Sequence, residues 1–252
     1  MKLIYFFKER SKRFKKYFLE FLMLFLAVFL GFFADNLRDA YVEKRIEKEY
    51  IKSLINDLET DKTNIQLIVE LNESRIKRLD SLTSLCFDFN LENRNDSQLY
   101  EHYKILNVRP DTFMPNEQTL QQLKNASGLR LIESKAVVHK ILEYEHRKKE
   151  LSSQQAYYET YHKSTSDLGL RLFTQKPFKE MASYRKRTGQ IWNAAIKYKL
   201  LQDAPLVLNE FANRLYSYQQ IVEYYNIMLN DTQKAADRLI LQLQNDYRLK
   251  TI

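Results

Sequence analysis

Residues 17–34 read YFLEFLMLFLAVFLGFFA, and this stretch decides how the rest of the chain is built. Its 18 residues hold a single charge, on Glu20. As an α-helix it would be about 27 Å long, close to the thickness of the hydrocarbon core of a bilayer. The stretch therefore predicts a transmembrane helix. The residues expected to form this membrane anchor and its two edges are Tyr17, Glu20, Phe21, Phe25, Phe29, Phe33 and Asn36.

Two other interpretations of the apolar stretch are less consistent with its residues. A cleavable signal peptide needs small residues before the cut, and a cut after Ala34 would place bulky Phe32 at one of those positions. A core helix of a soluble protein needs polar residues on one face, and residues 21–33 contain none. Glu20 lies one turn inside the edge, where it reaches the headgroups or contacts a partner helix.

Charge on either side of the anchor predicts its orientation. Residues 1–16 carry seven Lys or Arg and one Glu, a net charge of +6, whereas residues 35–49 mix both signs and are slightly acidic. The positive-inside rule places the basic tail in the cytoplasm and residues 35–252 on the other side. The apolar and basic side chains of the tail also suit a helix on an anionic lipid surface. We expect a single-pass protein of a bacterial inner membrane with its main domain in the periplasm.

Composition argues against nucleic acid as a partner and for an all-α class. The whole chain carries +8, but residues 17–252 carry only +2 once the tail is subtracted, and no zinc-finger or RNA-binding signature is present. The chain has four Gly and four Pro, and neither residue occurs between Phe32 and Arg109 or after Pro205. Such unbroken stretches predict long helices. The one cysteine, Cys86, is expected in the core.

Heptad spacing predicts three long helices. The first continues from the anchor to about Leu85, with Ile51, Leu58, Ile65 and Leu79 in one seam and Asn72 filling its gap. The second spans about 134–174 and the third about 205–247. The core seam of the third helix alternates spacings of three and four over the residues Leu208, Phe211, Leu215, Tyr218, Val222, Tyr225 and Leu229.

The expected fold is an N-terminal transmembrane helix that continues into an antiparallel bundle of long, coiled-coil-like helices with short capping helices. Residues 1–16 form the tail, 17–34 the span and 35–252 the bundle. We expect residues 88–133 to cap the end far from the membrane and the second long helix to return toward the bilayer. A basic connection at 175–188 would then lie near the headgroups, followed by a short helix at 191–201, and the C-terminus would lie far from the membrane.

No constellation of residues predicts an enzyme, a metal or a cofactor. The pairs Glu143–His146 and Glu159–His162 have the spacing found in helical di-metal sites, but both lie on one predicted helix about 24 Å apart. Ordinary surface residues are the simpler interpretation. The chain has no Gly-x-Ser-x-Gly elbow and no glycine-rich phosphate loop. No small-molecule substrate is indicated.

The chain resembles a family of uncharacterised single-span membrane proteins, a domain of unknown function abundant in Bacteroidota-type bacteria. Glu20 and Asn36 match the glutamate that opens the span and the asparagine that closes it, and LINDLETDKTNI at 54–65 resembles the charged helix that follows. The family's later turn is matched by Thr119, Leu123, Ser127, Gly128, Leu131 and Ile132, although Leu120 stands where an aromatic is usual. The resemblance implies a bacterial inner-membrane protein and carries no activity.

Complete packing seams without a chemical constellation predict an interaction protein. We expect a membrane-anchored, periplasm-facing helical scaffold or accessory subunit, with lipid and a protein partner or a second copy of the chain as its contacts. The alternative is a single-span sensor that signals through a partner helix in the membrane, contacted by Glu20.

Overall fold

The computed structural model describes residues 2–92, 96–125, 128–191, 197–203 and 205–249, and of residues 2–16 only the backbone. Its helices are α1 (Lys2–Phe87), α2 (Asp96–Tyr103), the 3-10 helix η1 (Lys104–Asn107), α3 (Gln118–Asn125), the 3-10 helix η2 (Gly128–Arg130), α4 (Lys135–Gly169), α5 (Lys176–Thr188) and α6 (Pro205–Tyr247). The described residues contain no strand and 83% of the chain is helical, so the predicted all-α bundle is confirmed.

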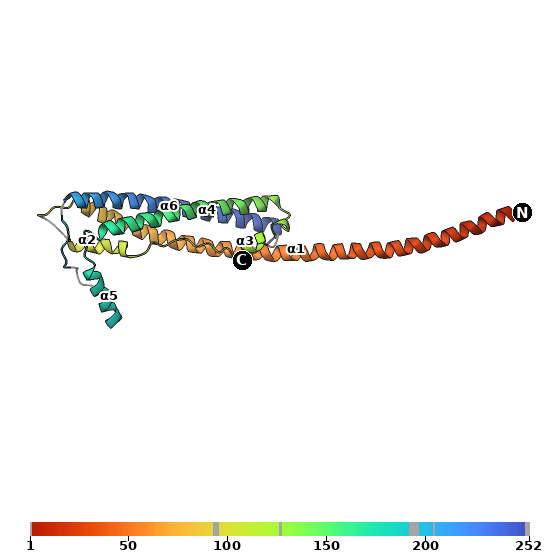
Figure 1. The fold of residues 1–252 in the computed structure, drawn as a ribbon, viewed down its shortest axis with the longest axis horizontal. Coiled ribbons are helices and arrows are strands. Elements are labelled where there is room, and N and C mark those ends of the chain that lie inside the picture. The colour runs from red at the N-terminus through yellow and green to blue at the C-terminus, as the bar shows by residue number, and fades with distance from the viewer. Residues whose placement is uncertain (1, 93–95, 126–127, 192–196, 204, 250–252) are drawn as a thin grey trace.

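The longest element, α1, is one unbroken helix of 86 residues. It contains no proline, and its one glycine, Gly31, has nothing within 4 Å of the position that a Cβ would take. Its first half projects alone from the molecule and its second half joins the bundle (Figure 1). The helix ends at a local turn, where the side chain of Asn90 accepts a 2.9 Å hydrogen bond from the backbone N–H of Glu92.

In the bundle, α6 packs along both the second half of α1 and α4 (Figure 1). We call the end from which α1 projects the anchor end and the opposite one the far end. The anchor-end core joins Ile51 of α1 with Val137 of α4 and Leu243 of α6. The far-end core joins Leu79 of α1 with Tyr158 of α4 and Leu208 of α6. All seven residues of the predicted core seam of α6 are fully buried.

The direction of α4 differs from the prediction. Its first residues share a core with Ile51, near the anchor end, and its last residue, Gly169, lies against Tyr103 at the far end. Helix α4 therefore runs parallel to the bundle half of α1, and α6 runs antiparallel to both. The C-terminal end of α6 consequently lies at the anchor end, where the Tyr247 hydroxyl donates a hydrogen bond to Glu47.

The segment between α2 and α3 explains this reversal, because it returns along the bundle instead of capping one end. Arg75 of α1 binds Arg109, whereas Asp57 binds Thr119, so the chain moves back by about 18 helical residues, or about 27 Å. Residues 109–117 have no regular secondary structure, and a chain near full extension covers about 3.3 Å per residue, which is enough for this distance. The two prolines in this segment exclude a helix, and extended backbone covers more than twice the length of helix per residue.

The predicted basic connection at 175–188 is instead the helix α5, and it lies at the far end rather than near the anchor (Figure 1). Pro177 is compatible with a helix because it occupies the first turn, where its missing N–H has no intrahelical partner. Gly189 ends the helix in a left-handed conformation with φ 71°. Of the predicted helix at 191–201, residues 192–196 lie outside the described residues, and 197–201 are not helical.

Gly169 allows the end of α4 to pack closely against α2 at the far end of the bundle. A Cβ at Gly169 would lie 2.5 Å from a ring carbon of Tyr103. That distance is far inside van der Waals contact, so a side chain at this position would push α2 and η1 away from α4. The glycine therefore marks a close approach of two elements as well as the end of α4.

The parallel direction of α1 and α4 can be measured with spin labels. Ser134 Oγ donates a 2.6 Å hydrogen bond to Asp246, so labels at the neighbouring exposed positions Lys135 and Asn245 should lie within about 25 Å. The reverse direction of α4 would separate them by about 50 Å, the length of the helix. Cys86 needs no replacement, because burial raises the pKa of its thiol to about 12 and keeps it unreactive. A distance near 50 Å would contradict this topology.

Candidate functional site

The membrane anchor predicted from the sequence is fully exposed in the fold. No residue of its most apolar window is buried, although the mean hydropathy of that window is 2.2. The helix is long and apolar enough to cross a membrane. Four phenylalanines form a ladder along it, with centroid separations of 6.1–6.3 Å between successive rings. The anchor residues Tyr17, Glu20, Phe21, Phe25, Phe29, Phe33 and Asn36 all lie on the surface.

Beyond the anchor, α1 carries the buried carboxylates of Asp57 and Asp61, one helical turn apart. Asp61 accepts a 2.7 Å hydrogen bond from the backbone N–H of Asn116. Asp57 accepts from the Asn116 side chain at 2.8 Å and from the backbone N–H of Thr119 at 3.2 Å. The two carboxylates therefore hold the start of α3 against α1. They also join two segments that the family resemblance was based on, 54–65 and the turn beginning at Thr119.

A third helix joins this cluster through Tyr144 of α4, whose hydroxyl donates a 2.6 Å hydrogen bond to Asp61. Burial raises the pKa of Asp61, and the hydrogen bond from Tyr144 opposes that effect. Burial and the neighbouring carboxylate of Asp61 raise the pKa of Tyr144. The phenol therefore stays protonated and acts as a fixed donor. This chemistry suits the positioning of three segments.

A second polar layer crosses the far half of the bundle at Asn72, which is fully buried. Its amide donates a 2.8 Å hydrogen bond to Asn226 of α6 and its oxygen accepts a 3.0 Å bond from Tyr158 of α4. Three side chains, one from each long helix, therefore contact one another in this polar layer. The sequence marked Asn72 as a gap in the apolar seam, but it gave no indication of the two partners.

Next to this layer, the buried guanidinium of Arg75 holds the extended return segment. It donates hydrogen bonds to the carbonyls of Ile105, at 3.1 Å, and Arg109, at 3.2 Å. Ile105 belongs to η1 and Arg109 follows it without regular structure, so the guanidinium joins the end of η1 and the start of the return segment to α1. Sequence reasoning did not single out Arg75. The signal that could have found it is its position, because it is a charged residue within an apolar seam.

The two Glu-x-x-His pairs do not form a metal site. His162 is half-buried and its Nδ1 lies 3.1 Å from the hydroxyl of Tyr218, whereas Glu159 lies 3.7 Å from Arg109. Glu143 is bound by Lys140 and Arg238. Among the residues that the structure describes, no group of three His, Cys, Asp or Glu side chains has the geometry to hold a metal ion.

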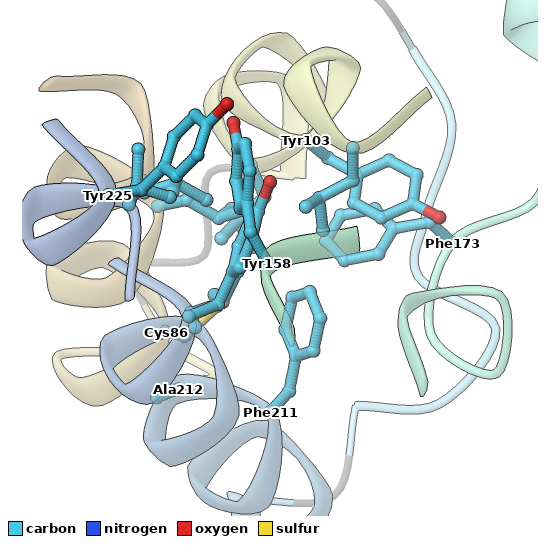
Figure 2. Packing of buried hydrophobic residues seen from close by; sticks show 14 of the residues in the cluster. Cys86, Tyr103, Tyr158, Phe173, Phe211, Ala212 and Tyr225 are labelled. Atoms are coloured by element: carbon cyan, nitrogen blue, oxygen red, sulfur yellow. The ribbon is translucent and has the colours of Figure 1, made fainter. Parts of the chain in front are cut away.

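An aromatic cluster closes the far end of the core. Figure 2 shows Tyr103 and Phe173 lying flat against each other, with a ring separation of 4.0 Å and an interplanar angle of 7°. Phe211 of α6 packs on Phe173 at 5.8 Å, and Phe178 of α5 lies 5.9 Å from Tyr103. These contacts fix α2, α5 and the start of α6 to one another, so the cluster acts in packing.

One hollow on the surface lies between the return segment and α4. This open groove of about 510 Å³ is lined by Met114, Glu117, Lys148 and Gln155 among others. Lys148 binds Glu145 at 2.6 Å. Burial alone would raise the pKa of Glu145, but hydrogen bonds from Lys124 and Lys148 lower it overall. Glu145 and Lys148 are thus paired with each other, whereas Lys149, which also lines the groove, is exposed.

Comparison with family models, curated proteins and solved structures finds no match to this chain. The resemblance to the Bacteroidota-type membrane family therefore stays a prediction. What the geometry defines is an all-helical bundle on a long apolar helix, with buried polar groups that are used to join its segments.

His162 should give the bundle a measurable dependence on pH. Burial, followed by the charge of Arg75, lowers its pKa to about 4 from an ordinary value of 6.5. The folded protein therefore keeps the ring neutral, while the unfolded chain takes up a proton below about pH 6.5. Stability from this source is complete above pH 6.5 and is lost as the pH falls toward 4. We expect the Tm of the full chain in detergent to fall over this range.

His162→Gln keeps an acceptor for Tyr218 but removes the titration, so its Tm should fall less steeply between pH 6.5 and 4. His146→Gln is the matched control, because the His146 side chain is 71% exposed. It should keep the slope of the natural chain. Equal slopes for the two variants would contradict the assignment.

Proposed function

We propose that this protein is a single-span membrane protein whose helical bundle acts as a periplasmic scaffold or accessory interaction subunit. The observation that carries the proposal is the continuity of α1, which passes from an exposed apolar stretch into the core of the bundle without a break. A scaffold needs a fixed connection between its anchor and its binding surfaces. An unbroken helix provides that connection because it curves only gently, and a sharp kink would need a proline or an interrupted hydrogen-bond ladder.

The exposure of the anchor supports placement in lipid. Large apolar side chains cover the helix on all sides from Tyr17 to Phe33, and Phe32 is 69% exposed. Monomeric soluble proteins rarely expose apolar patches above a few hundred Å². A bilayer removes this cost, because the side chains contact acyl chains and the helix satisfies its own backbone hydrogen bonds.

The orientation follows from charge. Residues 1–16 carry a net +6, and positively charged segments stay on the cytoplasmic side. The bundle would then lie in the periplasm of a bacterium, with its anchor end toward the bilayer.

The interaction role rests on the surface of α6. Tyr216, Tyr224, Ile227 and Leu241 are each more than half exposed, and their spacing places them on one side of the helix. The core seam of α6 faces the opposite way and is already filled. An exposed row of large apolar and aromatic side chains is the composition typical of protein interfaces.

The anchor and its orientation can be tested together. An enzyme reporter that is active only outside the cytoplasm, fused after Ile252, should be active and should sediment with membranes. Phe25→Arg combined with Phe29→Arg should abolish both results, because each charge in the middle of a span costs about 3 kcal/mol.

Tyr41→Arg is the control for this experiment. Tyr41 is 71% exposed and Phe29 is 53% exposed, so a soluble protein would tolerate all three changes. Only a membrane span would make the double variant at Phe25 and Phe29 behave differently from Tyr41→Arg. Full activity of the double variant, or an inactive reporter on the natural chain, would overturn the anchor or its orientation.

The interaction surface can be tested by photo-cross-linking in the natural host. A photoreactive amino acid at Ile227 should give a discrete product of higher mass, whether from a protein partner or from a second copy of the chain. The same amino acid at exposed Lys149 of α4 should give none. A protein that stays uncross-linked at both positions, and that purifies from membranes alone as a monomer, would contradict the scaffold proposal.

A further inference from the structure

The positive charge of this chain lies at two places that the fold holds far apart. One is the N-terminal tail, with +6, and the other is the segment 171–199, with eight Lys or Arg, one Glu and a net charge of +7. Since the whole chain carries +8, the remaining residues are net negative. The second concentration surrounds α5, at the far end of the bundle (Figure 1).

The side chains of α5 divide into two faces. Pro177, Phe178 and Met181 pack on the far-end core, which fixes the helix to the bundle. Tyr198 adds a 2.8 Å hydrogen bond to Glu180, the one carboxylate of α5. The cations Lys176, Lys179, Lys186 and Arg187 are all exposed on the opposite face, and we call these four residues the basic tip.

One carboxylate, Glu180, lies beside the basic tip, and it accepts the hydrogen bond from Tyr198. Among the described residues, none of its four cations forms an ion pair with a carboxylate, whereas lysines elsewhere, such as Lys62 and Lys148, have partners. A shallow open groove is lined by Lys176, Lys179 and Arg187 of the tip together with Glu180 and Ser183. Four like charges on one helix face repel one another, so an anionic partner would stabilise this surface.

The membrane that would hold the anchor is out of reach of the basic tip. Phe178 joins the core that contains Leu82 of α1, and about 48 helical residues separate Leu82 from Ala34. This places the tip about 70 Å from the end of the span. Charges interact over about 10 Å at physiological salt, so headgroups of the anchor's own bilayer cannot attract the tip.

We propose that the basic tip binds the anionic phospholipid headgroups of a second bilayer that faces the first. The chemistry is charge attraction between ammonium and guanidinium groups and phosphate. The apolar face of α5 is already occupied by the bundle, so binding is peripheral and needs no insertion. Together with the anchor, which the proposed function supplies, the basic tip makes the chain a bridge between two membranes.

Lipid fits the basic tip better than nucleic acid does. Single-stranded nucleic acids are bound by grooves that combine cations with exposed aromatic rings for base stacking. The aromatic rings of α5 are not available for this, because Phe178 points into the core and Tyr184 is half-buried. Binding to a headgroup surface requires only point charges on flexible side chains, and lysines provide these.

The test uses the full chain in closed vesicles of phosphatidylcholine, at less than one copy per vesicle. A resin that captures an N-terminal tag removes vesicles whose basic tail faces outward. Acceptor vesicles contain equal parts of phosphatidylglycerol and phosphatidylcholine, and co-flotation measures capture. We expect capture by these acceptors and none by pure phosphatidylcholine.

The combined change of Lys176, Lys179, Lys186 and Arg187 to Gln should lower the apparent affinity at least about tenfold. Gln at the exposed lysines Lys48, Lys77, Lys135 and Lys149 is the matched control and should change it by less than about twofold. Arg at Lys176, Lys179 and Lys186 should preserve capture. Unchanged thermal melting would show that the variants fold.

Two results would overturn the proposal. One is equal capture by the natural chain and the tip variant. The other is tip-dependent binding of single-stranded DNA or of an acidic protein without capture of phosphatidylglycerol vesicles. Loss of the chain from the donor vesicles would instead refute the membrane-anchor prediction. Flotation of the released protein with phosphatidylglycerol vesicles would still test binding by the basic tip.

Discussion

The hydrogen bonds that Asp57 and Asp61 make to the start of α3 are the constraint on which the topology depends. Both carboxylates are buried in α1 near the anchor end, and a buried carboxylate without partners is costly. Their donors are the backbone at Asn116 and Thr119, together with the Tyr144 hydroxyl. Satisfying them draws the chain back along the bundle after α2. Helix α4 must then start at the anchor end and run parallel to α1.

The polar layers of the bundle give it one register. Apolar seams with heptad spacing still pack after one helix slides by a heptad, at a modest loss of contacts. Asn72 meets Asn226 and Tyr158 at one level only, and a slide would leave buried amides and a phenol without partners. The hydrogen bonds from Arg75 to the return segment act in the same way. The buried polar side chains thus exclude alternative arrangements of helices that are otherwise regular.

The division of charge gives the molecule two ends of different character. The anchor end is joined to an apolar helix and a basic tail, and the far end carries α5 (Figure 1). The cations of α5 are exposed. Between them the bundle neutralises its charges locally, as Lys62 does with Glu59 and Asp237. Because α1 is unbroken, the separation of the two ends is a property of the backbone and does not depend on loops.

The sequence alone determined the three long helices and their buried faces. Scarce glycine and proline, the apolar run at 17–34 and the heptads of Val222 and its neighbours are local signals, and helices are formed by local hydrogen bonds. The direction of α4, the helical state of 176–188 and the place of the C-terminus were decided by the tertiary structure. They depend on pairs such as Asp57 with Asn116, which are 59 residues apart. A buried Asp or Asn in a seam shows that a partner is needed, but many residues could be that partner. Only the packed bundle selects one, because the hydrogen bond needs its two groups within about 3 Å and screened from water.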